Sequence, residues 1–278
     1  MKEKRIVITG MGIVSPIGIG KEEFYQSLAE GKSGIKPITL FDTTKYKVKV
    51  AGEIAQFDPE SILGKKGLLD LDRTTKLLLS SAKLALDDAS LLVGEENSSD
   101  IGVSVGTTFG SLNSVSKFDR ESITEGPRYV NPSVFPSTVG NSPASRVGIR
   151  FKIKGFNTTI STGMCSALDA LDYACDFIEL GRVNKVAVGS VEDLSIQTFL
   201  GCYKLKYLSG LLGGNPLSCP FDERRDGIVI AEGATTFILE SLEDAVSREA
   251  NIYCEILGLA SCFDPGRYYK YNLSSEGM

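Results

Sequence analysis

Short apolar runs alternate with segments of helical periodicity along most of the chain. Strand-like runs occupy residues 5–10, 48–54, 101–106, 156–162, 185–190, 234–240 and 252–261. Apolar positions at helical spacing predict helices at residues 21–31, 73–91, 241–250 and in a segment that begins near Ser166. Gly31 and Gly181 are expected to end two of these helices. This alternation predicts an α/β fold with a mostly parallel sheet that helices cover.

Residues 107–146 do not follow this alternation. Gly, Ser, Asn and Pro recur through the sequences GTTFGSLNS and YVNPSVFPSTVGNSPASR. A long irregular segment of this kind inside a compact domain is more often a functional or interface loop than a linker. We therefore expect a long loop here.

A glycine pair follows the first strand in the sequence GMGIVSPIG at 10–18. Ser15 occupies the place where a dinucleotide-binding fingerprint requires its third glycine, so we expect no cofactor at this turn. A tight turn that needs glycine conformations explains Gly10 and Gly12 without a ligand.

The composition is that of a soluble globular protein. The 278 residues are 42% hydrophobic and 23% charged, enough for one large α/β domain or two small ones. No apolar run approaches the ~18 residues of a membrane span, and the N-terminus does not resemble a signal peptide, so we expect a cytoplasmic protein. The net charge of −5 argues against nucleic acid as a general partner.

The chain has six cysteines and no histidine. No two cysteines form a CxxC pair, so a zinc site is not expected and the thiols should be reduced and mostly buried. Without histidine the chain can form neither a Ser/His nor a Cys/His pair, and it lacks the usual near-neutral general base. The sequence therefore disfavours an acyl-transfer enzyme that works on its own.

The stretch STGMCSALDAL at 161–171 places two sulfur-containing residues where a strand leads into a helix. A nucleophile is commonly presented at such a turn, at a helix N-terminus. Cys165 could ionise and attack, whereas the thioether of Met164 carries no proton and cannot accept an acyl group. Which of the two lies at the reactive position decides the function.

Five stretches of the chain together resemble the β-ketoacyl-acyl carrier protein synthases. They are RIVITGMGIVSPIG at the start, GTTFG at 106–110, NPSVFPST at 131–138, the turn at 161–167 and CPFDERRDGIVIAEGA at 219–234. The resemblance implies a thiolase-like fold of two similar halves that pairs into a dimer. It covers 1–278 as one ketosynthase N-terminal-type domain, with the first half at about 1–250 and the start of the second at 251–278. The family carries its two catalytic histidines and a lysine beyond this point.

The family's nucleophile turn has the general form S/A-T-A/G-C-T/S-S-G/A. An ungapped match places Thr162, Gly163 and Ser166 on the family positions, which puts Met164 on the nucleophile and Cys165 on the position after it. The resemblance thus implies a non-catalytic subunit, of the kind called a chain-length factor. Such a subunit forms a heterodimer with an active full-length ketosynthase and meets acyl carrier protein through that partner. Cys165 is then interpreted as a small buried thiol and the turn as packed.

The resemblance also implies roles for two sets of residues. Contacts with the acyl tunnel and the dimer partner are implied for Phe109, Leu112, Ser133, Val134, Thr138 and Cys202. The alternative for any one of these, Phe109 included, is simple core packing. A structural charged network is implied for Glu192, Asp222, Arg225, Asp226 and Glu232.

The helix after the turn carries Asp169, Asp172, Asp176 and Glu179 at spacings of three and four, so one face should meet water or cations. That pattern fits a molecule without a second sheet over this helix.

Three alternatives stay open. The chain could be a thiol-dependent acyltransferase that uses Cys165 with a base from another subunit, a scaffold that binds acyl carrier protein, or a fragment of a longer protein. The sequence does not fix the product, and aryl polyene or related polyene pathways are our expectation for a short partner of this kind.

Overall fold

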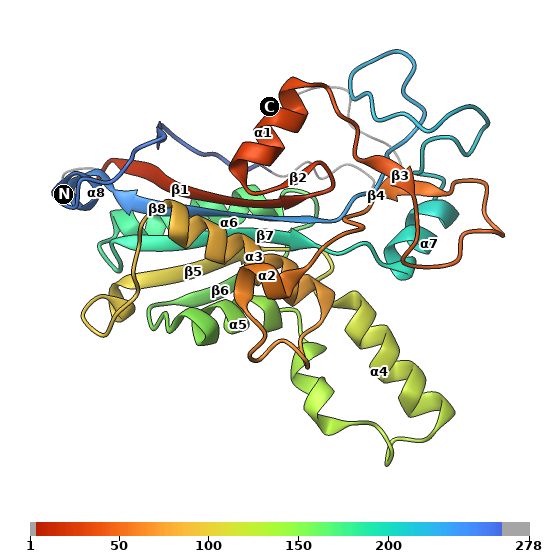
Figure 1. The fold of residues 1–278 in the computed structure, drawn as a ribbon, viewed down its shortest axis with the longest axis horizontal. Coiled ribbons are helices and arrows are strands. Elements are labelled where there is room, and N and C mark those ends of the chain that lie inside the picture. The colour runs from red at the N-terminus through yellow and green to blue at the C-terminus, as the bar shows by residue number, and fades with distance from the viewer. Residues whose placement is uncertain (1–3, 263–278) are drawn as a thin grey trace.

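The computed structural model describes residues 4–262, which form a mixed sheet with helices on both faces (Figure 1). The main sheet contains β1 (Ile6–Ser15), β2 (Gly18–Ile19), β5 (Ile101–Gly106), β6 (Asn157–Ile160), β7 (Lys185–Glu192), β8 (Gly233–Ser241) and β9 (Cys254–Ile256). Its order is β2-β1-β8-β7-β5-β6, with β9 also paired to β1. A separate two-stranded sheet pairs β3 (Ile35–Pro37) with β4 (Val50–Gly52).

The α-helices are α1 (Lys21–Ala29), α2 (Pro59–Leu63), α3 (Arg73–Asp88), α4 (Leu112–Thr124), α5 (Ser142–Phe151), α6 (Ser166–Glu179), α7 (Ile196–Lys204) and α8 (Leu242–Ser247). Two 3₁₀ helices are η1 (Ser98–Asp100) and η2 (Pro132–Ser137). The predicted helices thus correspond to α1, α3, α6 and α8. Gly31 and Gly181 both have φ of +67°, as a helix stop in the left-handed region requires.

The expectation of a mostly parallel sheet is wrong, because the sheet is mixed. β5 runs parallel to both β6 and β7, whereas β8 is antiparallel to both β7 and β1. Parallel strands need a crossover that packs across the sheet. After β7 the chain instead forms α7 beyond the end of the strand and returns from that same end, so Glu192 pairs with Gly233 at the start of β8.

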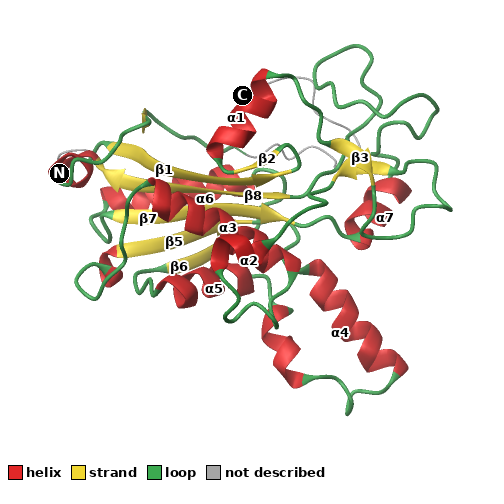
Figure 2. Cartoon of the chain, in the orientation of Figure 1, coloured by secondary structure: helices red, strands yellow, loops and turns green. Residues whose placement is uncertain are grey.

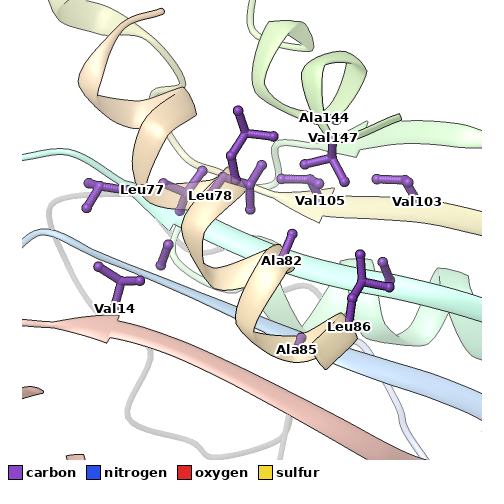
Figure 3. Close-up of a cluster of buried hydrophobic side chains, with 14 of the residues drawn as sticks. Val14, Leu77, Leu78, Ala82, Ala85, Leu86, Val103, Val105, Ala144 and Val147 are labelled. Atoms are coloured by element: carbon purple, nitrogen blue, oxygen red, sulfur yellow. The ribbon is translucent and has the colours of Figure 1, made fainter. Parts of the chain in front are cut away.

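Helix α3 packs its apolar side on one face of the sheet (Figure 3). Asp72 caps it by accepting a hydrogen bond from the Thr75 amide at 2.9 Å. Its core residues include Leu77, Leu78, Ala82, Ala85 and Leu86, which cluster with Val14, Val103 and Val105 of the sheet.

The glycine pair of β1 lies directly under α3. A Cβ at Gly12 would stand 1.9 Å from the Ser81 carbonyl oxygen, and one at Gly10 would stand 2.5 Å from that of Ala85. Neither glycine has a positive φ. The prediction of a tight turn here is therefore wrong, and the two glycines instead allow close approach of the helix and strand backbones.

Helix α6 covers the opposite face of the sheet. Ala170, Ala174 and Ile178 are buried in a second cluster with strand residues. On the outer side Asp176 and Glu179 are exposed, whereas Asp169 and Asp172 are partly buried. The predicted acidic face thus meets solvent along only part of its length.

The loop predicted at 107–146 is also wrong, since this segment contains α4, η2 and the start of α5. Helix α4 projects away from the sheet (Figure 2) and has no buried residue. The rings of Phe118 and Phe135 lie with centroids 5.9 Å apart and join α4 to η2. We call residues 112–138 the arm.

Three predicted strands are shorter than expected, with β6 reduced to four residues and β4 and β9 to three residues each. Most of the predicted start of a second half, residues 263–278, lies outside the described residues. No helix within the described range is both long enough and apolar enough to cross a membrane.

Candidate functional site

The turn between β6 and α6 is built around Gly163, whose φ is +92°. The Ser166 hydroxyl donates to the Gly163 carbonyl at 2.5 Å and accepts from the Thr162 amide at 3.0 Å. These bonds close the turn ahead of the first helical residue. Met164 and Cys165 follow Gly163 directly and stand at its outer side.

Both sulfur-containing residues of the turn are exposed. The Met164 side chain is 80% exposed, and Cys165 occupies the N-cap of α6 as an exposed thiol. The expectations of a packed turn and a buried Cys165 are therefore wrong. The physical reason is that the turn lies beyond the end of the sheet, where none of the described residues covers it. Because a thioether has no proton to lose, Met164 cannot be acylated.

The other cysteines also depart from the expectation of mostly buried thiols. Cys175 is buried, and burial raises the pKa of its thiol to about 12. Cys202 and Cys219 are half-buried, and Cys254 and Cys262 are exposed. Burial also raises the pKa of the Cys202 thiol. Neither Cys175 nor Cys202 is thus prepared to act as a thiolate near neutral pH.

A mostly apolar cavity of about 210 Å³ opens beside Met164. Phe109, Cys202, Ile228 and Ile230 form much of its wall. Of the six residues predicted to contact the tunnel or the dimer partner, the structure brings Phe109 and Cys202 together here. Phe109 remains 45% exposed, so it is not simple core packing.

The other four predicted contact residues do not line this cavity but lie on the arm. Leu112 is the first residue of α4, Ser133 and Val134 belong to η2, and Thr138 follows η2 directly. All four are at least partly accessible to solvent. The predicted set therefore divides into a cavity wall and a projecting arm.

The carboxylate of Glu192, at the end of β7, holds the loop that carries Phe109. One oxygen, Oε1, accepts from the Thr107 hydroxyl at 2.9 Å, from the Thr108 amide, and from the Phe109 amide at 3.3 Å. The Thr108 hydroxyl in turn donates to the Gly163 carbonyl at 2.9 Å. The cavity wall and the turn between β6 and α6, which we call the elbow, are thus connected by one chain of hydrogen bonds.

The next residue, Asp193, holds the start of the arm and was missed by the sequence analysis. It is 6% exposed, and its carboxylate accepts a hydrogen bond from the side-chain nitrogen Nδ2 of Asn113 at 2.9 Å. Burial raises its pKa to about 6, and the neighbouring negative charge of Asp72 acts in the same direction. The only available sequence signal was its position at the end of a buried strand.

Glu232 makes the buried ion pair of this region. Its carboxylate receives two hydrogen bonds from the Arg73 guanidinium, at 2.6 and 2.7 Å, and one from the Ile54 amide at 2.8 Å. The Glu232 side chain has no exposed surface, so these bonds offset the cost of burying its charge.

The remaining charged residues of the predicted network lie elsewhere on the surface. Asp222 pairs with Arg224 two residues away, and Arg225 donates to the Asp222 carbonyl oxygen. Asp226 accepts one hydrogen bond from the Ser209 hydroxyl and another from the Gly210 amide, and together these bonds lower the pKa of its carboxyl group. The five predicted residues are therefore held in separate clusters rather than in one network.

Comparison with known proteins identifies the family. Residues 3–245 match the model of the β-ketoacyl synthase N-terminal domain. The chain belongs to the β-ketoacyl synthase family. Its fold is accordingly the N-terminal domain of the thiolase-like ketosynthase fold.

Two relatives are 3-oxoacyl-[acyl-carrier-protein] synthases by name. The 3-oxoacyl-[acyl-carrier-protein] synthase 2 of Coxiella burnetii is 32% identical over 280 residues, covering 100% of this chain and 68% of the relative. The protein of the same name from Vibrio cholerae is 33% identical and is covered to 67%.

Solved structures agree with this assignment. The ishigamide ketosynthase/chain length factor matches with a TM-score of 0.84 at 28% identity, over 92% of this chain and 63% of that one. A β-ketoacyl synthase from Burkholderia phymatum STM815 matches with a TM-score of 0.80 at 27% identity. The chain thus spans about two thirds of the length of these relatives.

Within this ketosynthase domain the site combines Met164 with an apolar cavity. The described residues contain no cluster of three or more His, Cys, Asp or Glu side chains arranged for a metal. Met164 supplies no nucleophile, whereas the apolar cavity beside it is open to a side chain or to an acyl chain.

Proposed function

We propose that this chain is a non-catalytic, chain-length-factor-like subunit that forms a heterodimer with a full-length ketosynthase and shapes its acyl tunnel in fatty-acid or polyketide biosynthesis. The observation that carries the proposal is Met164, which the family pattern assigns to the nucleophile position and which lines an apolar cavity at the start of α6. The elbow and the cavity wall are built, but the reacting atom is lacking.

Chemistry on this chain alone would need more than a thiol. Acyl transfer requires a thiolate, a general base and donors for the oxyanion. The chain has no histidine, and the carboxylates near Met164 are engaged in holding loops. Condensation therefore falls to the partner.

The exposed apolar surface of the arm supports pairing with another subunit. Ile123, Tyr129, Phe135 and, on the adjacent α5, Ile149 are between 56% and 83% exposed. Strand β6 pairs with β5 on one side, and its other edge meets no described strand. Large exposed apolar patches and open sheet edges are characteristic of protein interfaces. We expect a heterodimer interface above ~2,000 Å² in total.

Coexpression with a full-length ketosynthase tests the pairing. We expect a heterodimer in which only the partner subunit becomes acylated, because the partner supplies the nucleophile and the general base. Intact mass spectrometry after incubation with an acyl thioester should show no adduct on this chain. A stable, monodisperse monomer at micromolar concentration that ignores ketosynthases would contradict the proposal, and binding to acyl carrier protein alone would favour a scaffold.

Restoring the thiol is the matching catalytic test. Met164→Cys should not make the isolated chain condense malonyl and acyl thioesters, since the chain has no histidine to act as general base. Condensation by this variant without a partner would show that the chain holds a complete catalytic site.

A second candidate is favoured by one observation, the exposure of Cys165 at the N-terminus of α6. A thiol-dependent acyltransferase would use this sulfur with a base from another subunit. Alkylation by iodoacetamide at pH 7 separates the two functions, with the exposed Cys254 as the matched control. Reaction at Cys165 much faster than at Cys254, together with loss of acyl transfer in Cys165→Ser, would support the enzyme.

A further inference from the structure

A single carboxylate oxygen organises the loop that carries Phe109. Oε1 of Glu192 accepts from three consecutive residues, through the Thr107 hydroxyl and the amides of Thr108 and Phe109. Glu192 and Phe109 both line the apolar cavity beside Met164. The group that fixes the backbone and the side chain that forms the wall therefore share one cavity.

We propose that Glu192 is a positioning residue that fixes Phe109 at the cavity wall and thereby sets the length of acyl chain that the site accommodates. This inference rests on the proposed tunnel-shaping function. It names a residue that acts through the Phe109 backbone and takes no part in the chemistry itself.

Packing alone does not fix Phe109, because its side chain is 45% exposed. Further support comes from hydrogen bonds to Thr108, whose hydroxyl donates to Gly163 at 2.9 Å and whose carbonyl accepts from Ser161 at 3.2 Å. Both of these bonds stop one residue short of Phe109. The amide of Phe109 itself donates to Glu192, so loss of that carboxylate removes the hydrogen bond that holds the Phe109 backbone at the cavity wall.

The charge of the acceptor matters as well as its presence. Hydrogen bonds to an ionised carboxylate are about twice as strong as those between neutral groups. Glu192→Gln keeps an acceptor oxygen of nearly the same shape but removes the charge, whereas Glu192→Ala removes the acceptor. The two variants should therefore form a graded series.

Glu53 provides a matched control elsewhere in the chain. Its buried carboxylate also accepts from a threonine hydroxyl and from two consecutive amides, those of Thr39 at 2.7 Å and Leu40 at 3.2 Å. Glu53 does not line the cavity beside Met164. Glu53→Ala thus reproduces the loss of a loop-anchoring carboxylate without touching the wall.

The functional test compares these variants in the heterodimer with a ketosynthase, by mass spectrometry of the products. We expect Glu192→Ala to lengthen or broaden the product distribution by one or more two-carbon units, in the same direction as Phe109→Ala. Glu192→Gln should lie between this variant and the wild type, and Glu53→Ala should leave the distribution unchanged. A fully assembled Glu192→Ala heterodimer with the wild-type distribution, beside a shifted Phe109→Ala, would overturn the inference and leave the proposed function intact.

Amide hydrogen exchange on the purified chain tests the anchor without any partner. We expect exchange of the Thr108 and Phe109 amides to accelerate about ten-fold or more in Glu192→Ala, less in Glu192→Gln, and not at all in Glu53→Ala. Unchanged exchange at both amides in Glu192→Gln and Glu192→Ala would refute the positioning role whatever the heterodimer does. If Glu192→Ala does not fold, Glu192→Gln decides both measurements.

Discussion

Asp193→Asn should stabilise the protein at neutral pH and leave it unchanged in acid. Asp193 is almost fully buried at the end of β7, and burial raises the pKa of its carboxyl to about 6 from an ordinary 3.8. The nearby carboxylates of Asp72 and Glu232 act in the same direction, whereas the hydrogen bond from Asn113 favours the charged form. An asparagine side chain has nearly the same shape and still accepts the Asn113 hydrogen bond.

The size and sign of the effect follow from proton linkage. A folded-state pKa above the unfolded one means that the native state binds the proton more tightly, so the free energy of unfolding falls as pH rises from about 4 to about 6. Above that window the whole penalty applies. A difference of about 2 pKa units corresponds to about 3 kcal/mol, which is the upper bound on what Asp193→Asn can recover at pH 7.5.

Urea unfolding of both proteins at pH 4.5, 5.5, 6.5 and 7.5 measures this difference directly. The gain from Asp193→Asn should grow across the series and level off above pH 6.5. Asp226→Asn is the control of opposite sign, because hydrogen bonds from Ser209 and Gly210 lower the Asp226 pKa. Its removal should cost stability by about the same amount at all four pH values, which lie above the ordinary carboxyl pKa. A gain from Asp193→Asn that is constant with pH would show that this carboxylate is not buried as the structure has it.

Two further changes test the cavity wall and the buried ion pair. Phe109→Ala should let a partner ketosynthase add one or more two-carbon units, since each methylene that enters an apolar space gains about 0.8 kcal/mol. Mass spectrometry of the products measures this change. A fully assembled heterodimer with an unchanged product distribution would show that Phe109 does not limit chain length. Arg73→Ala should lower the free energy of unfolding by about 3–5 kcal/mol, because it leaves the buried Glu232 charge unpaired, and denaturant titration showing a loss below about 1 kcal/mol would contradict this.

The parts of the fold that the sequence predicted are those with a one-sided apolar pattern. Helices α3 and α6 each bury a stripe of residues against the sheet, and that stripe is visible as helical spacing. Helix α4 was missed although Leu112, Val115 and Phe118 recur at helical spacing, because the Gly, Ser, Asn and Pro residues around it favoured a loop. The direction of β8 was also hidden, since a buried strand has the same apolar pattern whether its neighbour is parallel or antiparallel.

For the candidate site, the family pattern located the elbow but not its surroundings. Matching motif positions placed Met164 after Gly163, and the structure shows that turn with the positive φ that glycine allows. Exposure depends on which other segments reach the turn, so the accessible Met164 and Cys165 could not be read from local sequence. The role of Asp193 was likewise invisible, because its partner Asn113 lies 80 residues earlier in the chain.

In the heterodimer that we propose, subunit pairing and closure of the cavity would be energetically linked. Met164, Ile123, Tyr129 and Phe135 are all more than half exposed. Burying a large apolar side chain contributes about 1.5–3 kcal/mol, so covering these four would supply about 6–12 kcal/mol. That range is comparable with the ~4–15 kcal/mol that association costs in lost translational and rotational freedom. Burial of these side chains alone would therefore leave binding marginal, and the β6 edge and polar contacts would have to contribute further binding free energy. Met164 stands at the cavity, so a partner that covers it, as we propose, would also complete the wall formed by Phe109. The effect of Phe109 on chain length therefore has to be measured in the heterodimer.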